Sequence, residues 1–196
     1  MSADSVIADV GESIIHLLQE QMADMVSPDA IALQSPGDLT GQNIRLSLFL
    51  YHLEENAYLK NQAVDPAYGY TRLPPLTLDL SYMLTTFSYL PNLTERSLEE
   101  HRLLGRAMRI LHDYAELAGS TLQGGLASTE TKLKITMVPA SVQHMAEIWN
   151  TFPDHHYRPS ACYVVTPVVI DSSSVVTPKL VKTRDLQYSS LDLKNQ

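Results

Sequence analysis

The chain has 196 residues, of which 44% are hydrophobic and 18% charged, and a net charge of −8. This composition is that of a globular protein, and the length favours one domain with at most a short appendage. The acidic balance disfavours nucleic acid as a partner, because phosphate binding needs clustered cations. The single cysteine, Cys162, excludes an internal disulfide and any site built from several cysteines.

The charge is unevenly distributed along the chain. Residues 175–196 carry four basic and two acidic residues, which leaves ten basic and twenty acidic residues in 1–174. The first residues lack a basic segment followed by an apolar one, and no run approaches 18 apolar residues, so we expect neither a signal peptide nor a membrane helix. An acidic body with a basic tail fits a tail that docks on an acidic surface, and a solvated terminus is the alternative.

The first predicted elements are a helix and two strands. Apolar residues recur at three- and four-residue spacing over 5–26, which predicts an amphipathic helix. Residues 27–42 read as loop with a short strand at 30–34. Residues 43–52 alternate, and the second face of this strand is half apolar, which predicts an interior strand.

An irregular stretch, residues 53–75, follows the strand and contains Tyr58, Tyr68 and Tyr70. Long irregular segments within compact domains are often functional. Two interpretations of the tyrosines are open: they pin the loop to the body, or they contact a neighbouring subunit.

The second half begins with the strongest strand signal, residues 76–87, and then a helix at about 94–117. Ser97 with Glu100 and Asn92 with Glu95 are competing helix starts, and Gly119 is the expected C-cap. The expected buried stripe of this helix comprises Leu98, Leu104, Ala107, Met108, Leu111 and Ala115. Arg102, Arg106 and Arg109 form a basic strip elsewhere on it, which either is solvated or contacts an acidic neighbour.

The last elements are a strand at 131–138 with Leu133, Ile135 and Met137 inward, a helix capped by Ser141 that ends at Trp149, and a core strand at 160–170. Pro167 indicates an edge or a bulge near the end of that strand. This order predicts an α+β domain over 1–171, with a mixed or antiparallel sheet of about four to five strands and two or three helices. Residues 172–196 would form an extended C-terminal arm.

The sequence contains no recognisable catalytic constellation. Gly124-Gly125 lacks the Lys-Ser/Thr of a phosphate-binding loop, and no Gly-x-Ser-x-Gly turn occurs. His112, Glu116 and His155 are the best candidates for a metal-dependent hydrolase, but they lack a two-histidine helix motif. We therefore expect no catalytic residue, no metal and no cofactor.

Four segments of the chain resemble a known family: LSLFLYHLEENAYLKNQ, RLPPLTLDLSYMLTTFS, EEHRLLGRAMRILHDYAEL, and EIWNTF followed by YRPSACYVVTPVVID. They are similar to the N-terminal domain of the tail-terminator, or cap, proteins of extracellular contractile injection systems, the phage-tail-like particles of the antifeeding-prophage type. The matched residues are Tyr51, Glu55, Asn56, Leu78, Leu80, Tyr82, Leu84, Glu100, His101, Leu104, Gly105, Leu111, His112, Trp149 and Tyr163.

The resemblance implies a non-enzymatic homohexameric ring on the last layer of a contractile sheath and its inner tube, without nucleic acid, membrane or cofactor. Such a particle would be assembled in the cytoplasm and could be released. By analogy with related sheaths, the arm would add a strand to a sheath or neighbouring subunit through Val175, Val176, Lys179, Leu180, Val181, Lys182, Arg184 and Leu186. A baseplate or adaptor position in the same particle is the alternative.

Overall fold

The computed structural model describes residues 3–39, 43–60, 71–72 and 74–176. Its three α-helices are α1 (Val6–Gln21), α2 (Leu93–Asp113) and α3 (Val142–Trp149). Its strands are β1 (Ile31–Leu33), β2 (Leu46–Glu55), β3 (Thr71–Arg72), β4 (Leu76–Thr86), β5 (Glu116–Ala118), β6 (Lys132–Val138), β7 (Ser160–Ile170) and β8 (Val175–Val176). Short 3₁₀ turns occupy Ala3–Ser5, Pro28–Ala30, Pro36–Asp38, Gly119–Thr121 and Gly124–Ser128.

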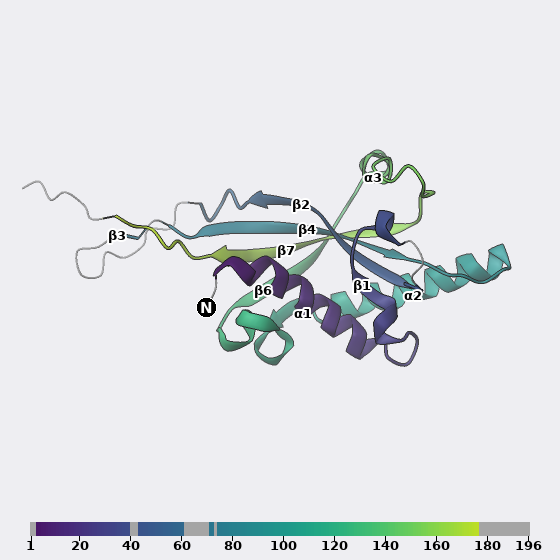
Figure 1. The fold of residues 1–196 in the computed structure, drawn as a ribbon, viewed down its shortest axis with the longest axis horizontal. Helices are drawn as coiled ribbons and strands as arrows, with labels where there is room; N and C mark the ends of the chain where they lie inside the picture. The colour runs from purple at the N-terminus through teal and green to yellow at the C-terminus, as the bar shows by residue number, and fades with distance from the viewer. Residues whose placement is uncertain (1–2, 40–42, 61–70, 73, 177–196) are drawn as a thin grey trace, which may run out of the picture.

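Six strands form the main sheet in the order β1-β2-β4-β7-β6-β5, and β3 and β8 form a small second sheet (Figure 1). Only β1 and β2 pair in parallel within the main sheet; its other pairs are antiparallel. The predicted α+β class and mixed sheet are confirmed. The main sheet has six strands rather than four to five, because Glu116–Ala118, expected at the end of a helix, forms β5.

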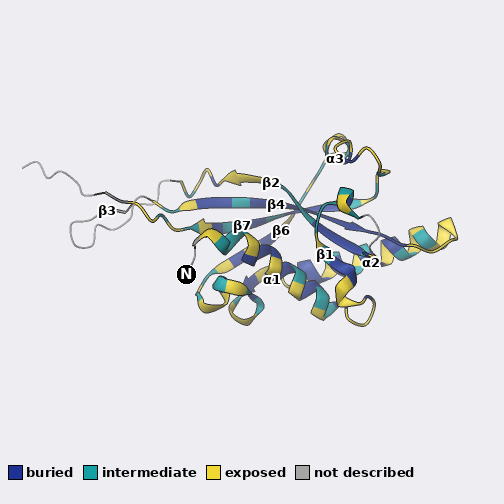
Figure 2. Ribbon diagram, viewed as in Figure 1, coloured by how far each residue is buried: buried dark blue, intermediate teal, exposed yellow. Residues whose placement is uncertain are grey.

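The two faces of the sheet are covered by different helices. Leu80, Tyr82 and Leu84 of β4 are buried with the apolar residues of α1 and α2 in the larger core cluster. Met83, whose side chain points to the other face, is buried with Met145 and Trp149 of α3 and the loop that follows it. The alternation of β4 therefore places α1 and α2 on one face and α3 on the other, as Figure 2 shows with buried strands between partly exposed helices.

The predicted helices exist, but their boundaries differ. The first ends at Gln21 rather than 26, and Met22 follows it as the C-cap. The second starts at Asn92, whose side chain accepts hydrogen bonds from the backbone N–H groups of Thr94 and Glu95, so the earlier of the two candidate starts is the correct one. Gly119 is not its C-cap, because the helix ends at Asp113 and Gly119 opens a separate 3₁₀ turn.

The expected buried stripe of α2 is confirmed at Ala107 and Leu111, and Leu104 and Met108 are half-buried against the core. Leu103, Ala107, Ile110 and Leu111 are buried, whereas Leu98 is exposed. The N-terminal part of α2 extends beyond the sheet (Figure 2), so Leu98 has no strand to pack against. A hydrophobic period shows which face of a helix is apolar but not how much of the helix has a neighbour.

The strand predictions are confirmed at β1, β2, β4, β6 and β7, with changes at their ends. β2 runs to Glu55 rather than 52, and it is interior between β1 and β4 as expected. Pro167 lies at an irregularity in the β4–β7 register, which confirms the expected bulge. Met137 lies on the α1 and α2 side of the sheet as expected, opposite Tyr163, but it is 52% exposed.

Candidate functional site

The residues proposed for a metal-dependent hydrolase do not form a site. His112 lies on α2, Glu116 lies on β5 and forms an ion pair with Lys132 at 2.9 Å, and His155 follows α3, the helix on the opposite face of the sheet. Among the residues that the structure describes, no group of three His, Cys, Asp or Glu side chains is placed to hold a metal ion. His112 and Glu116 do not share a helical face, because α2 ends at Asp113.

The single thiol is buried in the α3-side core. Burial raises the pKa of Cys162, and its Sγ lies 3.4 Å from Sδ of Met145. Burial and the adjacent Cys162 also raise the pKa of the Tyr51 hydroxyl. A thiol that resists ionisation is a poor nucleophile, so Cys162 is a packing residue.

Several residues of the family pattern serve the fold. Glu100 is buried, accepts a hydrogen bond from the backbone N–H of Ser88 at 3.0 Å, and forms an ion pair with Arg158, whose guanidinium lies over the ring of Phe87. Asn56 is also buried, and its Nδ2 donates to Asp79 at 2.9 Å. These contacts fix α2 and the end of β2 to the central strands.

The Asn56 side chain also fixes the turn that carries Tyr58. Its Oδ1 accepts hydrogen bonds from the backbone N–H groups of Tyr58 and Leu59, both at 3.0 Å. Tyr58 is 96% exposed, so the interpretation that it pins the loop is wrong, and a role in contacting another subunit stays a prediction. Tyr68 and Tyr70 lie outside the described residues.

The predicted arginine strip divides into two parts. Arg106 donates from Nη2 to the carbonyl of Gln21 at 3.0 Å and lies 3.5 Å from Asp24, so its guanidinium contacts the chain's own body. Arg102 and Arg109 are exposed. An inter-subunit role for the strip therefore remains a prediction for these two residues.

The short edge strands β1 and β5 pair with only part of β2 and β6, so each of these longer strands has an unpaired stretch on its outer side within the described residues. β1 pairs with Leu46–Leu48 of β2, and β5 pairs with Lys132–Lys134 of β6. In the described part of the chain, no strand pairs with the outer side of His52–Glu55 or of Thr136–Val138. We call these two segments the β2 free edge and the β6 free edge.

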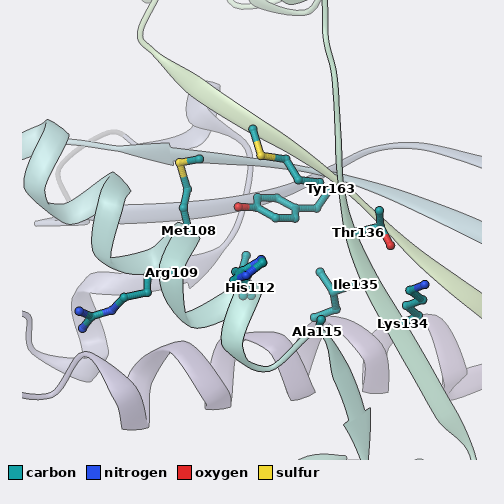
Figure 3. A pocket seen from close by; sticks show the side chains of 10 residues that line it. Met108, Arg109, His112, Ala115, Lys134, Ile135, Thr136 and Tyr163 are labelled. Carbon is teal, nitrogen blue, oxygen red and sulfur yellow. The ribbon is translucent and has the colours of Figure 1, made fainter.

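A pocket of about 500 Å³ lies beside the β6 free edge, between the C-terminal part of α2 and strands β6 and β7 (Figure 3). Its lining is largely apolar and includes Met108, Leu111, Ile135, Met137 and Tyr163. The Tyr163 ring lies across the pocket with its hydroxyl toward α2, while the Arg109 side chain extends outward from the helix. The pocket is suited to an apolar side chain rather than to polar chemistry.

The sequence could not identify these edges. The pattern of 43–52 and 131–138 predicts strands, but which of their sides lacks a partner depends on how far β1 and β5 extend. The one available signal was the change from apolar to charged residues at Leu53, Glu54 and Glu55.

The predicted arm is described only at its start. Val175 and Val176 pair with Arg72 and Thr71 as β8 and β3, so their backbone is already paired within the chain. The other arm residues named above, Lys179, Leu180, Val181, Lys182, Arg184 and Leu186, lie outside the described residues. No helix in the described part is long and apolar enough to cross a membrane.

Comparison with known proteins decides the family. A model of the Pvc16 N-terminal domain matches residues 9–184. The chain belongs to the Pvc16 N-terminal domain family. No curated protein is similar enough in sequence to count as a match.

Two solved structures share the fold of this family member. The sheath/tube terminator of PVC, an extracellular contractile injection system, in its extended state is 21% identical with a TM-score of 0.58 over 94% of this chain. The tube terminating cap of the anti-feeding prophage is 17% identical with a TM-score of 0.58 over 93% of this chain. The chain spans 65% and 61% of the length of these two proteins.

Proposed function

We propose that this protein is a non-enzymatic terminator of a contractile injection particle, which caps the distal end of the sheath and inner tube as a ring of six copies. Membership in the Pvc16 N-terminal domain family is the observation that carries this proposal. The likeness to a sheath/tube terminator and to a tube terminating cap supports it.

A terminator needs docking surfaces rather than a catalytic centre. A head-to-tail contact that does not close produces an open polymer, and a closed ring that fits the last layer ends its growth. The free edges of β2 and β6 and the exposed Tyr58 are available for such contacts. The protein would join the particle in the cytoplasm and leave the cell with it.

The C-terminal arm supplies a further contact in this proposal. Its apolar residues are set among Lys179, Lys182 and Arg184, a composition suited to a strand added to an acidic sheet edge. The acceptor is a sheath subunit or a neighbouring copy of the chain. Residues before the arm constitute the domain that caps the polymer.

Two measurements test the proposal. Native mass spectrometry should give a ring, with six copies as the expected mass. A truncation after residue 176 should remain folded by circular dichroism yet co-sediment more weakly with purified sheath. Unchanged co-sedimentation of the truncated chain would refute the role of the arm, and absence of binding by the full chain would refute the terminator role.

A further inference from the structure

We propose that the β2 free edge of one copy pairs with the β6 free edge of the next copy, so that neighbouring copies of the ring share one continuous sheet. The inference rests on the proposed ring and specifies the contact that builds it. The partner is a second copy of this chain, and four features of the described residues support that choice.

The first feature is strand direction. β2, β4, β7 and β6 are each antiparallel to the next, so β2 and β6 run in opposite directions within one copy. A copy related by rotation about an axis along the strands would therefore present β6 antiparallel to β2, as in most pairs of the main sheet. Because the contact joins two different surfaces, it is head-to-tail and closes into a ring when the rotation per copy allows.

The second feature is an exposed apolar side chain on each edge. Leu53 is opposite Leu80, whose side chain faces the α1 and α2 core, and Met137 is opposite Tyr163, which faces the same core. Leu53 is 49% exposed and Met137 is 52% exposed. If the two edges pair, the Leu53 and Met137 side chains lie on the same face of the shared sheet, and Leu53 can enter the pocket beside Met137.

The third feature is charge on the β6 side. Of the lysine and arginine side chains that the structure describes, only Arg102, Arg109 and Lys134 have neither an ion pair nor a hydrogen bond. Hydrogen bonds from Ser88 and Arg45 lower the pKa of Glu99, and the charge of Arg102 adds a smaller effect, so Arg102 has a carboxylate neighbour. Arg109 and Lys134 both border the pocket, in a chain whose net charge is −8.

The fourth feature is the opposite charge on the β2 side. Glu54 is opposite Asp79, and Lys134 is opposite Thr166, which donates a hydrogen bond to Asp79, so Glu54 and Lys134 lie on the same face of the sheet. Glu55 lies on the other face and already forms an ion pair with Lys60 at 2.7 Å, so it is the lesser contributor. Pairing β2 with β6 therefore brings Glu54 near Lys134, whereas pairing either edge with its own copy would oppose like charges.

The competing occupant of the β2 free edge is the basic C-terminal arm, whose charge also suits Glu54 and Glu55. The same charge disfavours the arm at the β6 free edge, next to Lys134. The two occupants are distinguished by truncation after residue 176, since sheet pairing between bodies keeps the ring intact and arm docking loses it.

The test is a charge exchange read by native mass spectrometry and size-exclusion chromatography across a concentration series. We expect Glu54→Lys and Lys134→Glu each to raise the concentration at which half the chain is in rings by at least about tenfold, because like charges then meet at each contact. The double variant should return toward wild type. Glu147→Lys, an exposed charge reversal on α3 that lies outside both edge segments, is the matched control.

Folding is checked by circular dichroism. Glu54→Lys should fold, because it places a cation opposite Asp79. If Lys134→Glu weakens β6, Arg109→Glu replaces it, since Arg109 is at an exposed helix position. Leu53→Ser should also weaken the ring, whereas Leu93→Ser, which removes a leucine that is exposed at the start of α2, should not.

The inference would be overturned if the single variants formed rings at the same concentration as Glu147→Lys, or if the double variant formed rings no more readily than the single variants. Loss of the ring on truncation after residue 176 would also overturn it. A wild-type chain that stays monomeric at every concentration would overturn it as well. In that case co-sedimentation of the wild type with sheath decides separately whether the terminator proposal survives.

Discussion

The contact between α1 and the 3₁₀ turn at Gly124–Ser128 can be tested by substituting glycines. Gly124 has a φ of 59°, and a Cβ there would collide with the carboxylate of Asp9. Asp9 is buried on α1 and accepts a hydrogen bond from the backbone N–H of Gly125 at 3.0 Å. Gly119 has a nearly identical φ of 58°, but a Cβ there would meet nothing within 4 Å.

These two glycines separate backbone strain from the loss of the Asp9 contact. Alanine in the left-handed region costs roughly 1–2 kcal/mol, and the reduced freedom of the unfolded chain returns about 0.4–1 kcal/mol, so Gly119→Ala should cost about 1 kcal/mol. Gly124→Ala should cost about 2 kcal/mol more, because displacing the buried Asp9 carboxylate weakens a charge-assisted hydrogen bond.

The assay is urea unfolding followed by circular dichroism, with the free energies compared at equal m-values. In an Asp9→Ala background, Gly124→Ala should cost no more than Gly119→Ala does in the wild type, since the collision is then absent. Equal destabilisation by the two glycine substitutions in the wild type would refute the assignment of the extra cost to Asp9.

Three further predictions concern single side chains. Asn56→Ala should destabilise the chain by about 2–3 kcal/mol in urea unfolding, because it removes the bond to Asp79 and both turn bonds; a loss below 0.5 kcal/mol would contradict this. Burial raises the pKa of the Tyr82 and Tyr163 hydroxyls, so the neutral forms stabilise the fold below pH ~10 and that stability is lost as pH rises further; ultraviolet titration should show delayed ionisation that disappears in denaturant. Cys162 should react with a thiol reagent at least about 100-fold more slowly when folded than in urea, and equal rates would show that the thiol is accessible.

The sequence predicts the regular elements well because their apolar periods are long. The alternation in 76–86 and 160–170 reflects strands that contact neighbours on both sides and cores on both faces. Ser141 and Asn92 cap their helices by local hydrogen bonds, which depend on a few adjacent residues and can therefore be read from the sequence.

The errors occur where the outcome depends on distant parts of the chain. The predicted second helix runs to residue 117, but pairing with Lys132–Lys134 makes Glu116–Ala118 a strand. Leu98 and Met137 occupy apolar positions of regular elements and are exposed because no neighbouring element reaches them. Local periodicity cannot specify where a neighbour ends.

The candidate interaction surfaces follow the same rule. The strand that contains Glu54 and the strand that contains Lys134 are both predicted from the sequence, but their unpaired sides are defined by the short lengths of β1 and β5. Tyr58 was identified as a candidate contact, and its exposure depends on the Asn56 side chain that holds the turn.

Localisation of the protein on assembled particles tests the terminator proposal most directly. A gold label on a tag at the N-terminus, viewed by negative-stain electron microscopy, should appear once per particle at the end of the sheath opposite the spike. Label at the spike end would favour a baseplate or adaptor role, and label distributed along the sheath or absent from particles would contradict the account.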